Sequence, residues 1–299
     1  MTTYHNPVLL KESVDGLDIK SDGVYVDVTF GGGGHSREIL KRLGEKGRLL
    51  AFDQDEEAVQ NTIGDSRFTL INENYRYISQ FLKFYGIRKV DGVLADFGVS
   101  SHQFDKAERG FSTRFDADLD MRMSRKNSLS AFDVVNSYDF ESLSRVLFTY
   151  GDLRNANGMA RAIIAFREGM PIKTTEQFKE VLGSFLPKHR EHKVLAQIYQ
   201  AIRIEVNQEI RAIEEFLGQM PEIMDAGGRL SIISYHSLED RLVKRFIRTG
   251  GFEGEPEKDF YGNISVPFKK VGGLITPLRE EIKSNSRARS AKLRIAERI

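Results

Sequence analysis

The sequence contains no cysteine and few histidines, which limits the chemistry that it can support. Without cysteine there are no disulfide bonds and no thiolate metal ligands, and the six histidines show no spacing typical of a zinc site, so we expect no bound metal. Apolar runs stay well short of the roughly 20 residues that a membrane helix needs. The opening MTTYHNPVLLKESV has neither the basic start nor the apolar core of a signal peptide. These absences predict a cytoplasmic protein without a membrane span.

A large excess of charge of either sign is also missing. Lys and Arg number 44 against 43 Asp and Glu, so the formal net charge is +1. If the chain binds nucleic acid, its basic surface must be local, because the global charge cannot supply the attraction to phosphate. The length of 299 residues suffices for one large α/β domain or for a domain that carries a substantial insertion.

Short, nearly continuous apolar runs occur in the first hundred residues, as expected for strands buried on both faces of a parallel sheet. They cover residues 24–30, 47–53, 68–72 and 90–99. Segments with helical spacing separate them, at 35–47, 55–64 and 75–86. The alternation predicts a doubly wound α/β sheet with right-handed crossovers.

This alternation stops near residue 100. Helix-like patterns without a convincing buried strand follow at 157–168, 174–186 and 193–220. A strand-like run then returns at 227–237, with a helix-like segment at 238–248 and extended segments at 274–283 and 291–297. We therefore predict a discontinuous sheet domain of residues 1–104 and 221–299, with an inserted helical domain of residues 105–220.

Four consecutive glycines, residues 31–34, follow the first predicted strand and precede a helix. Such a turn lets the backbone approach a ligand and leaves N–H groups at the helix start for an anion or polar group, although a tight turn without a ligand would look the same. Asp53 ends the second predicted strand, 20 residues after Gly33, which is the spacing that presents a carboxylate to ribose hydroxyls. Asp53 could instead cap the next helix, as could Asp55. Together the features favour a cofactor with an adenosine end.

Pyrophosphate is a less suitable ligand for this turn, because a dehydrogenase would usually place a third glycine near Ser36. S-adenosylmethionine also has an adenosine end and carries no phosphate. Its carboxylate can occupy the helix N-terminus instead.

Several sequence blocks resemble those of a known family. They are YVDVTFGGGGHS, DFGVSSHQFDKAERGFS, LDMRM, QAIRIEVNQEI, GGRLSIISYHSLEDRLVKRF and NSRARSAKLRIAER. Together they are similar to the MraW/RsmH family of S-adenosylmethionine-dependent 16S ribosomal RNA cytosine-N4 methyltransferases, from about Asn6 to Arg298. The resemblance implies a Rossmann-like, mostly parallel, seven-stranded methyltransferase sheet, with an inserted α-helical domain that has an RNA-recognition role. It also implies methylation of the exocyclic N4 of a cytosine near the decoding centre of the small ribosomal subunit.

The resemblance further implies a set of cofactor contacts in or after the predicted strands. Asp53 would bind the ribose hydroxyls, and Tyr75, where the family usually has Phe, would lie against the adenine. Asp96 or Gln103 would bond to polar atoms of the cofactor or the target base. The full set is Gly33, Gly34, His35, Asp53, Tyr75, Asp96 and Gln103.

Methylation of an amine needs an acceptor for its proton or hydrogen bond beside the methyl group. Many amino-methyltransferases carry a polar residue followed by Pro-Pro-aromatic after the fourth strand, but here the sequence reads ADFGVSS. Asp96 is our catalytic candidate, although cofactor binding would explain it equally well. Because the sulfonium methyl is already activated, we expect positioning to contribute more than a base does.

Residues after the predicted fifth strand are candidates for RNA contact. Tyr235 could stack on a cytosine that has left its stack, and His236 could bond to its edge or to a phosphate, although both could simply pack a helix start. Arg241 lies in the next helix, and Arg287 and Arg289 lie in a tail, 279–299, with seven basic residues against three acidic ones. Such a run suits RNA phosphates, although it is usually a solvated face. The expected partner is 16S rRNA or the small subunit, and a homodimer stays open.

Two other functions share part of this pattern. A nicotinamide-dependent oxidoreductase would share the glycine turn and Asp53, and it would bind NAD in place of S-adenosylmethionine. A noncatalytic RNA-binding protein of ribosome assembly would share the basic tail, and it would transfer no labelled methyl group.

Overall fold

The computed structural model describes residues 7–254, 260–262 and 266–299. The chain forms two compact units, the first made of Met1–Gly98 with Ile210–Ile299 and the second of Val99–Glu209. The boundaries predicted from the sequence, 104/105 and 220/221, both lie further along the chain. The difference at the second boundary has a physical reason, because helix α10 (Glu209–Ile223) contributes apolar side chains to the core of the first unit.

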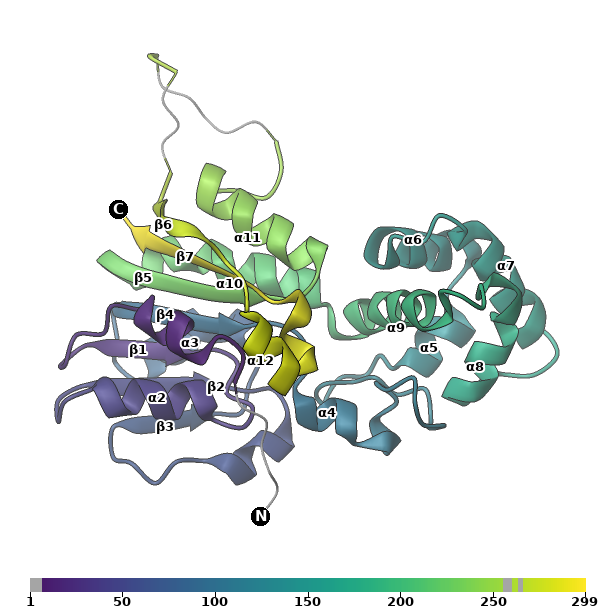
Figure 1. The fold of residues 1–299 in the computed structure, drawn as a ribbon, viewed down its shortest axis with the longest axis horizontal. Helices are drawn as coiled ribbons and strands as arrows, with labels where there is room; N and C mark the ends of the chain where they lie inside the picture. Colours follow the sequence, from purple (N-terminus) through teal and green to yellow (C-terminus); the bar gives the residue numbers. More distant parts are fainter. Residues whose placement is uncertain (1–6, 255–259, 263–265) are drawn as a thin grey trace. The chain divides into compact units, whose positions relative to one another are not determined.

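The first unit contains a seven-stranded sheet with the order β3-β2-β1-β4-β5-β7-β6 (Figure 1). Strands β1 to β5 pair in parallel, whereas β7 runs antiparallel between β5 and β6. This arrangement confirms the predicted Rossmann-like, mostly parallel sheet. The strands are β1 Val24–Asp27, β2 Arg48–Phe52, β3 Phe68–Ile71, β4 Val90–Asp96, β5 Met224–Ser234, β6 Phe268–Ile275 and β7 Lys292–Arg298.

Helices cover both faces of this sheet. Because successive strand residues point to opposite faces, β1 to β4 each supply two cores, and this explains their continuous apolar runs. One core contains residues of α3, α10 and α11, and the other contains residues of α1 and α2. The helical elements of the unit besides α10 are α1 Leu10–Asp15, α2 Gly34–Arg42, η1 Glu56–Asn61, η2 Tyr75–Tyr77, α3 Ile78–Phe84, α11 Ser237–Thr249, α12 Arg279–Ser284 and η5 Ser286–Ser290.

The second unit is helical and has a hydrophobic core of its own. In the chain its residues lie between two parts of the first unit, after β4 and before most of α10. The second unit is therefore an insertion in the sheet domain, as predicted. Its elements are α4 Ser101–Asp105, η3 Ala107–Arg109, α5 Ala131–Ser137, α6 Phe140–Gly151, α7 Ala156–Arg167, α8 Thr175–Val181, η4 Gly183–Phe185 and α9 Glu191–Asn207.

The long helical pattern at 193–220 is not one helix, which corrects the sequence prediction. α9 ends at Asn207, and Gln208 adopts a left-handed conformation with φ of 50° before α10 begins. The buried Asn207 side chain donates to the Met121 carbonyl at 2.8 Å and accepts from the Met123 amide at 2.7 Å. These bonds join residues 84 and 86 positions apart, so helical periodicity could not reveal them.

Two shorter segments also differ from the prediction. The segment 55–64 forms a 3₁₀ helix, η1, rather than an α-helix, and the segment 274–283 is not extended throughout. β6 stops at Ile275, two residues before Pro277, which cannot donate to a strand ladder. Glu280 and Glu281 then occupy the first turn of α12, where acidic residues favour a helix.

Candidate functional site

The glycine turn joins the carboxyl end of β1 to α2. Gly31 and Gly33 have φ of 50° and 75°, a region that residues with a side chain rarely adopt, and Gly33 is the N-cap of α2. At Gly34 an added Cβ would lie 2.1 Å from the ring of Pro7, whereas at Gly31 it would meet no atom within 4 Å. Among the described residues, the backbone amides of Gly34 and His35 have no hydrogen-bond partner, so both are donors for a ligand.

A buried carboxylate hydrogen-bonds to residues on either side of this turn, and the sequence prediction missed it. Asp27, the last residue of β1, is fully buried; it accepts the Ser36 hydroxyl at 2.7 Å and the Thr29 amide at 3.1 Å. Burial raises the pKa of Asp27 to about 6, although these hydrogen bonds act to lower it. The signal in the sequence was an acidic residue inside an otherwise apolar run.

The His35 side chain is buried, and its partner is a backbone group of the protein itself. It is 5% exposed, and Nε2 lies 3.2 Å from the Val8 carbonyl oxygen. Because a carbonyl only accepts, Nε2 carries the proton. Burial lowers the pKa of His35, so the ring is neutral at pH 7. The structure therefore favours the backbone amide of His35, more than its ring, for contact with a ligand.

Asp53 follows β2 and connects the second strand end to the glycine turn. Its Oδ2 accepts the Gly31 amide at 2.8 Å, and its Oδ1 accepts the Asp55 amide at 2.8 Å. The side chain is half-buried, and burial raises its pKa to about 6. Asp55 is the residue that caps η1, since its side chain accepts the Glu57 amide. Helix capping therefore does not explain Asp53.

Tyr75 is the first residue of η2, and a short loop separates it from the end of β3. Its half-buried ring lies 5.9 Å from the Phe97 ring and 5.4 Å, edge to face, from the Phe216 ring, measured between centroids. These contacts hold an aromatic surface beside the end of the parallel strands.

Asp96 is the last residue of β4, and it lies beside Tyr235, which follows β5. The Tyr235 hydroxyl donates to Oδ1 of Asp96 at 2.7 Å, and the Asp96 amide donates to the Thr29 hydroxyl at 2.7 Å. Burial raises the pKa of Asp96 to about 6, although His35 and the Tyr235 hydrogen bond act in the opposite direction. The sequence prediction placed both residues near the site but did not foresee their hydrogen bond.

Glu239 is a second buried acid that the sequence prediction missed. It is fully buried, and its Oε2 accepts the backbone amides of Tyr235 at 2.8 Å and His236 at 3.2 Å. His236 is the N-cap of α11, with Nε2 3.0 Å from Oε1 of Glu239. The signal was the spacing His236-x-x-Glu239, which is that of a capping box. These contacts fix the loop that carries Tyr235.

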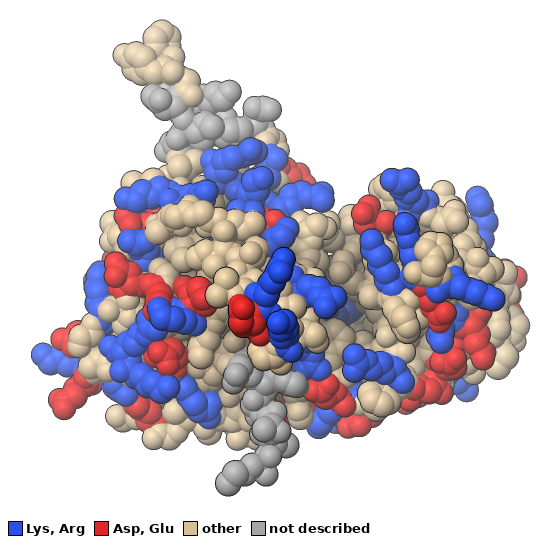
Figure 2. Space-filling view, in the orientation of Figure 1, with Lys and Arg blue, Asp and Glu red and all other residues tan. Residues whose placement is uncertain are grey.

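The basic candidates differ in how accessible they are. Arg241 on α11 and Arg289 in η5 are exposed, whereas Arg287 is half-buried. Two further basic residues of the tail, Lys292 and Arg294, pair with Asp240 at 3.3 and 2.7 Å. Figure 2 shows Lys and Arg side chains gathered on the part of the first unit that carries α11. The basic tail is therefore partly structural and partly available to a partner.

Gln103 belongs to the second unit, unlike the other predicted cofactor contacts. It is 4% exposed, and its side chain accepts the Ser100 amide at 3.1 Å as part of the capping box of α4. The first unit by itself brings the other predicted contacts to the carboxyl ends of its parallel strands, where ligands of doubly wound sheets bind. They are Gly33, Gly34, His35, Asp53, Tyr75 and Asp96.

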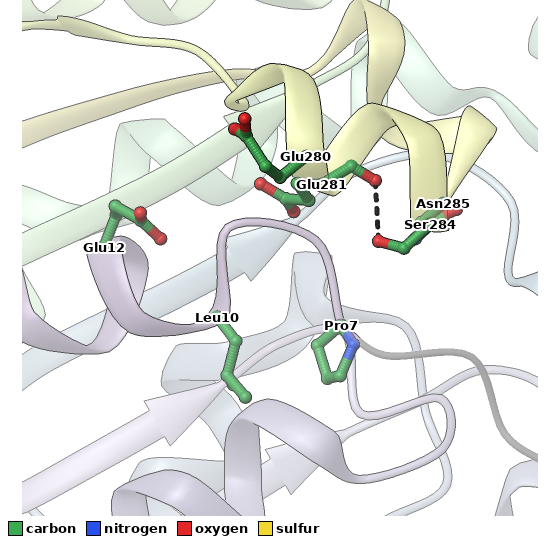
Figure 3. Close-up of a pocket in the computed structure, with 7 residues that line it drawn as sticks. All are labelled: Pro7, Leu10, Glu12, Glu280, Glu281, Ser284 and Asn285. Carbon is green, nitrogen blue, oxygen red and sulfur yellow. Dashed lines mark hydrogen bonds between the residues drawn. The ribbon is translucent and has the colours of Figure 1, made fainter.

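A cavity of about 470 Å³ lies elsewhere in the first unit, between residues near α1 and residues of α12 and its C-cap (Figure 3). Its lining combines apolar side chains with three carboxylates, and Glu281 also accepts the Leu9 amide at 2.7 Å. No predicted site residue lines it. The lining residues are Pro7, Leu10, Glu12, Glu280, Glu281, Ser284 and Asn285.

Comparisons with known proteins cover nearly the whole chain. The family model described as the MraW methylase family matches residues 2–299. A relative from Christiangramia forsetii, named ribosomal RNA small subunit methyltransferase H, is 68% identical over 296 residues, 99% of this chain and 98% of the relative. Proteins of the same name from Flavobacterium johnsoniae and Bacteroides thetaiotaomicron are 67% and 54% identical, covering 100% and 99% of this chain and 100% and 98% of their own lengths.

Proposed function

The chain belongs to the MraW methylase family, and from this membership we propose that it methylates ribosomal RNA of the small subunit. More specifically, we propose that it transfers a methyl group from S-adenosylmethionine to the exocyclic N4 of a cytosine in 16S rRNA, near the decoding centre. The observation that carries the proposal is the family match over residues 2–299, together with the match to relatives named as small-subunit rRNA methyltransferases over 98% and 100% of their lengths.

The residues at the strand ends fit S-adenosylmethionine. The amides of Gly34 and His35 can bind its carboxylate, and the space beside Gly31 is open. We propose that Asp53 holds the ribose hydroxyls, since each of its oxygens accepts one backbone amide and retains a further lone pair. Tyr75 would lie against the adenine, and Gln103, from the second unit, is the remaining proposed contact.

The chemistry assigns a separate role to Asp96. When bound, S-adenosylmethionine supplies a methyl group on a positively charged sulfur, and the methyl–sulfur bond breaks with its electron pair on sulfur. The methylated amine is then positively charged and must lose one proton. Asp96, ionised above its pKa of about 6, is the proposed acceptor of that proton.

Contact with RNA is proposed for residues of α11 and η5 and of the segment between β5 and α11. Tyr235 and His236 would meet the extruded cytosine, and Arg241, Arg287 and Arg289 would meet phosphates. The inserted second unit is proposed to recognise RNA. Among the described residues no helix has the length and apolar character to cross a bilayer, and we propose that the protein acts in the cytoplasm.

Transfer of a labelled methyl group tests the proposal. The chain is incubated with S-adenosylmethionine labelled in its methyl group and with small ribosomal subunits, or separately with naked 16S rRNA. The RNA is digested, and the labelled nucleoside is identified by mass spectrometry. We expect N4-methylated cytidine. A label on another base, on another atom of cytosine, or no label with either substrate would refute the specificity or the activity.

A further inference from the structure

Asp96 and Tyr235 follow adjacent parallel strands, and backbone contacts fix both residues. Asp96 is in register with Ile233 of β5, and the Phe97 amide donates to the Ile233 carbonyl at 3.0 Å. The Asp96 amide is held by the Thr29 hydroxyl and the Tyr235 amide by buried Glu239. The two side chains therefore meet because the sheet places them together.

The hydrogen bond between them orients the carboxylate. Oδ1 of Asp96 accepts the Tyr235 hydroxyl at 2.7 Å, and no hydrogen bond to Oδ2 is present among the described residues. With one oxygen held, rotation of the carboxylate is restricted, and Oδ2 is the oxygen that remains to accept a proton. Burial raises the pKa of Tyr235 far above its ordinary value, so this phenol stays protonated and remains a donor.

We propose that Tyr235 is a positioning residue, whose hydroxyl orients Asp96 and keeps it ionised so that Oδ2 can take the proton released by the methylated amine. This inference rests on the proposed function and adds to it the residue that prepares the acceptor. The proton leaves nitrogen and forms a bond to Oδ2, while Tyr235 keeps its own proton throughout.

The charges around the pair have opposing effects on Asp96. Burial and the nearby acids Asp27 and Glu239 disfavour its ionised form, whereas the Tyr235 hydroxyl favours it, as does His35 at a pH low enough to protonate its ring. Glu281 lies near enough to disfavour ionisation of Tyr235 as well. Removal of the Tyr235 hydroxyl therefore removes one of the contacts that favour the carboxylate of Asp96.

Titration of the Asp96 carboxyl group tests this without reference to catalysis. Aspartate labelled with ¹³C at its carboxyl carbon is followed by NMR against pH in the wild type and in Tyr235→Phe, and Asp96→Asn assigns the signal. Replacement by Phe keeps the ring, so we expect a folded protein. We expect the midpoint of Asp96 to rise by about one pH unit, the effect of one hydrogen bond to a charged group.

The rate of methyl transfer against pH supplies the second readout. In Tyr235→Phe the acidic limb of kcat is expected to move up in pH by the same amount, with the affinity for S-adenosylhomocysteine unchanged. Tyr138→Phe is the matched control, because the Tyr138 hydroxyl donates to Glu205 at 2.9 Å in the other unit. That variant should leave both the midpoint and the limb in place.

The outcomes separate this inference from the proposed function. An unmoved Asp96 midpoint in Tyr235→Phe, or a rate lowered equally at every pH, overturns the inference even if the wild type methylates RNA. A wild type that transfers no methyl to small-subunit RNA overturns the proposed function, and with it the catalytic meaning of a shifted midpoint. A shift of both midpoint and limb in an active enzyme supports the inference.

Discussion

The carboxylate of Asp53 accepts the Gly31 amide at 2.8 Å, so the residue that directly follows the second strand fixes the turn that follows the first. The same carboxylate also holds the Asp55 amide. A change at Asp53 therefore affects both a proposed ligand contact and the shape of the loop that would bind the ligand. This double role decides how mutations at the site should be compared.

Replacing Asp53 by Ala should weaken binding of S-adenosylhomocysteine by about 1 to 3 kcal/mol, because charge-assisted hydrogen bonds to the ribose are lost. Isothermal titration calorimetry measures the change. Asp53→Asn retains an acceptor oxygen for one backbone amide and should bind with intermediate affinity. Asp65→Ala, at a loop carboxylate that pairs with Arg67, is the control and should bind as the wild type does. Wild-type affinity in Asp53→Ala would remove Asp53 from the site.

Replacing Gly34 by Ala should destabilise the fold, although alanine normally favours a helix. The added Cβ would lie 2.1 Å from the Pro7 ring, and relief of such overpacking typically costs about 1 to 3 kcal/mol. Urea unfolding measures the loss in free energy of unfolding. Gly64→Ala meets no atom within 4 Å and serves as the control. Equal stability of the two variants would mean that the N-terminal segment does not pack on the turn.

Asp27→Asn should become more stable, relative to the wild type, as the pH rises. The pKa of Asp27 is about 6 in the folded protein against 3.8 in the unfolded chain, so its contribution is fully present below pH 4 and is lost as the pH rises through 6. The Asn side chain does not ionise. The difference in free energy of unfolding, variant minus wild type, should increase by about 2 kcal/mol between pH 4 and pH 7.

Asp65 provides the control of opposite sign for that experiment. Its hydrogen bonds with Arg67 lower its pKa to about 2, so its contribution is present above pH 4 and is lost as the pH falls toward 2. Asp65→Asn should therefore lose stability relative to the wild type as the pH rises from 2 to 4. A flat difference for Asp27→Asn between pH 4 and pH 7 would show that Asp27 is not desolvated.

Removing Glu209 should strongly destabilise the second unit. Glu209 and Arg203 form a buried, two-bond ion pair with distances of 2.8 and 3.0 Å, and loss of one partner of such a pair costs about 3 to 5 kcal/mol. Arg211→Ala breaks an exposed ion pair with Glu215 and should cost less than about 1 kcal/mol. Thermal unfolding compares the two, and equal losses would contradict the difference in burial.

The sequence predicted those parts of the fold that depend on local patterns. Continuous apolar runs predicted the strands, because both faces of this sheet are covered, and the glycine turn and Asp53 marked two of the strand ends. Contacts between distant residues were not predictable. The Asn207 bonds that end α9, the packing of α10 on the sheet and the hydrogen bond from Tyr235 to Asp96 each join residues that no periodicity relates.

Calorimetric titration of the wild-type chain with S-adenosylmethionine, and separately with NAD, tests most directly whether these strand ends form a methyl-donor site. The account predicts saturable binding of one S-adenosylmethionine per chain and no heat of binding with NAD. Saturable binding of NAD with none of S-adenosylmethionine would contradict it.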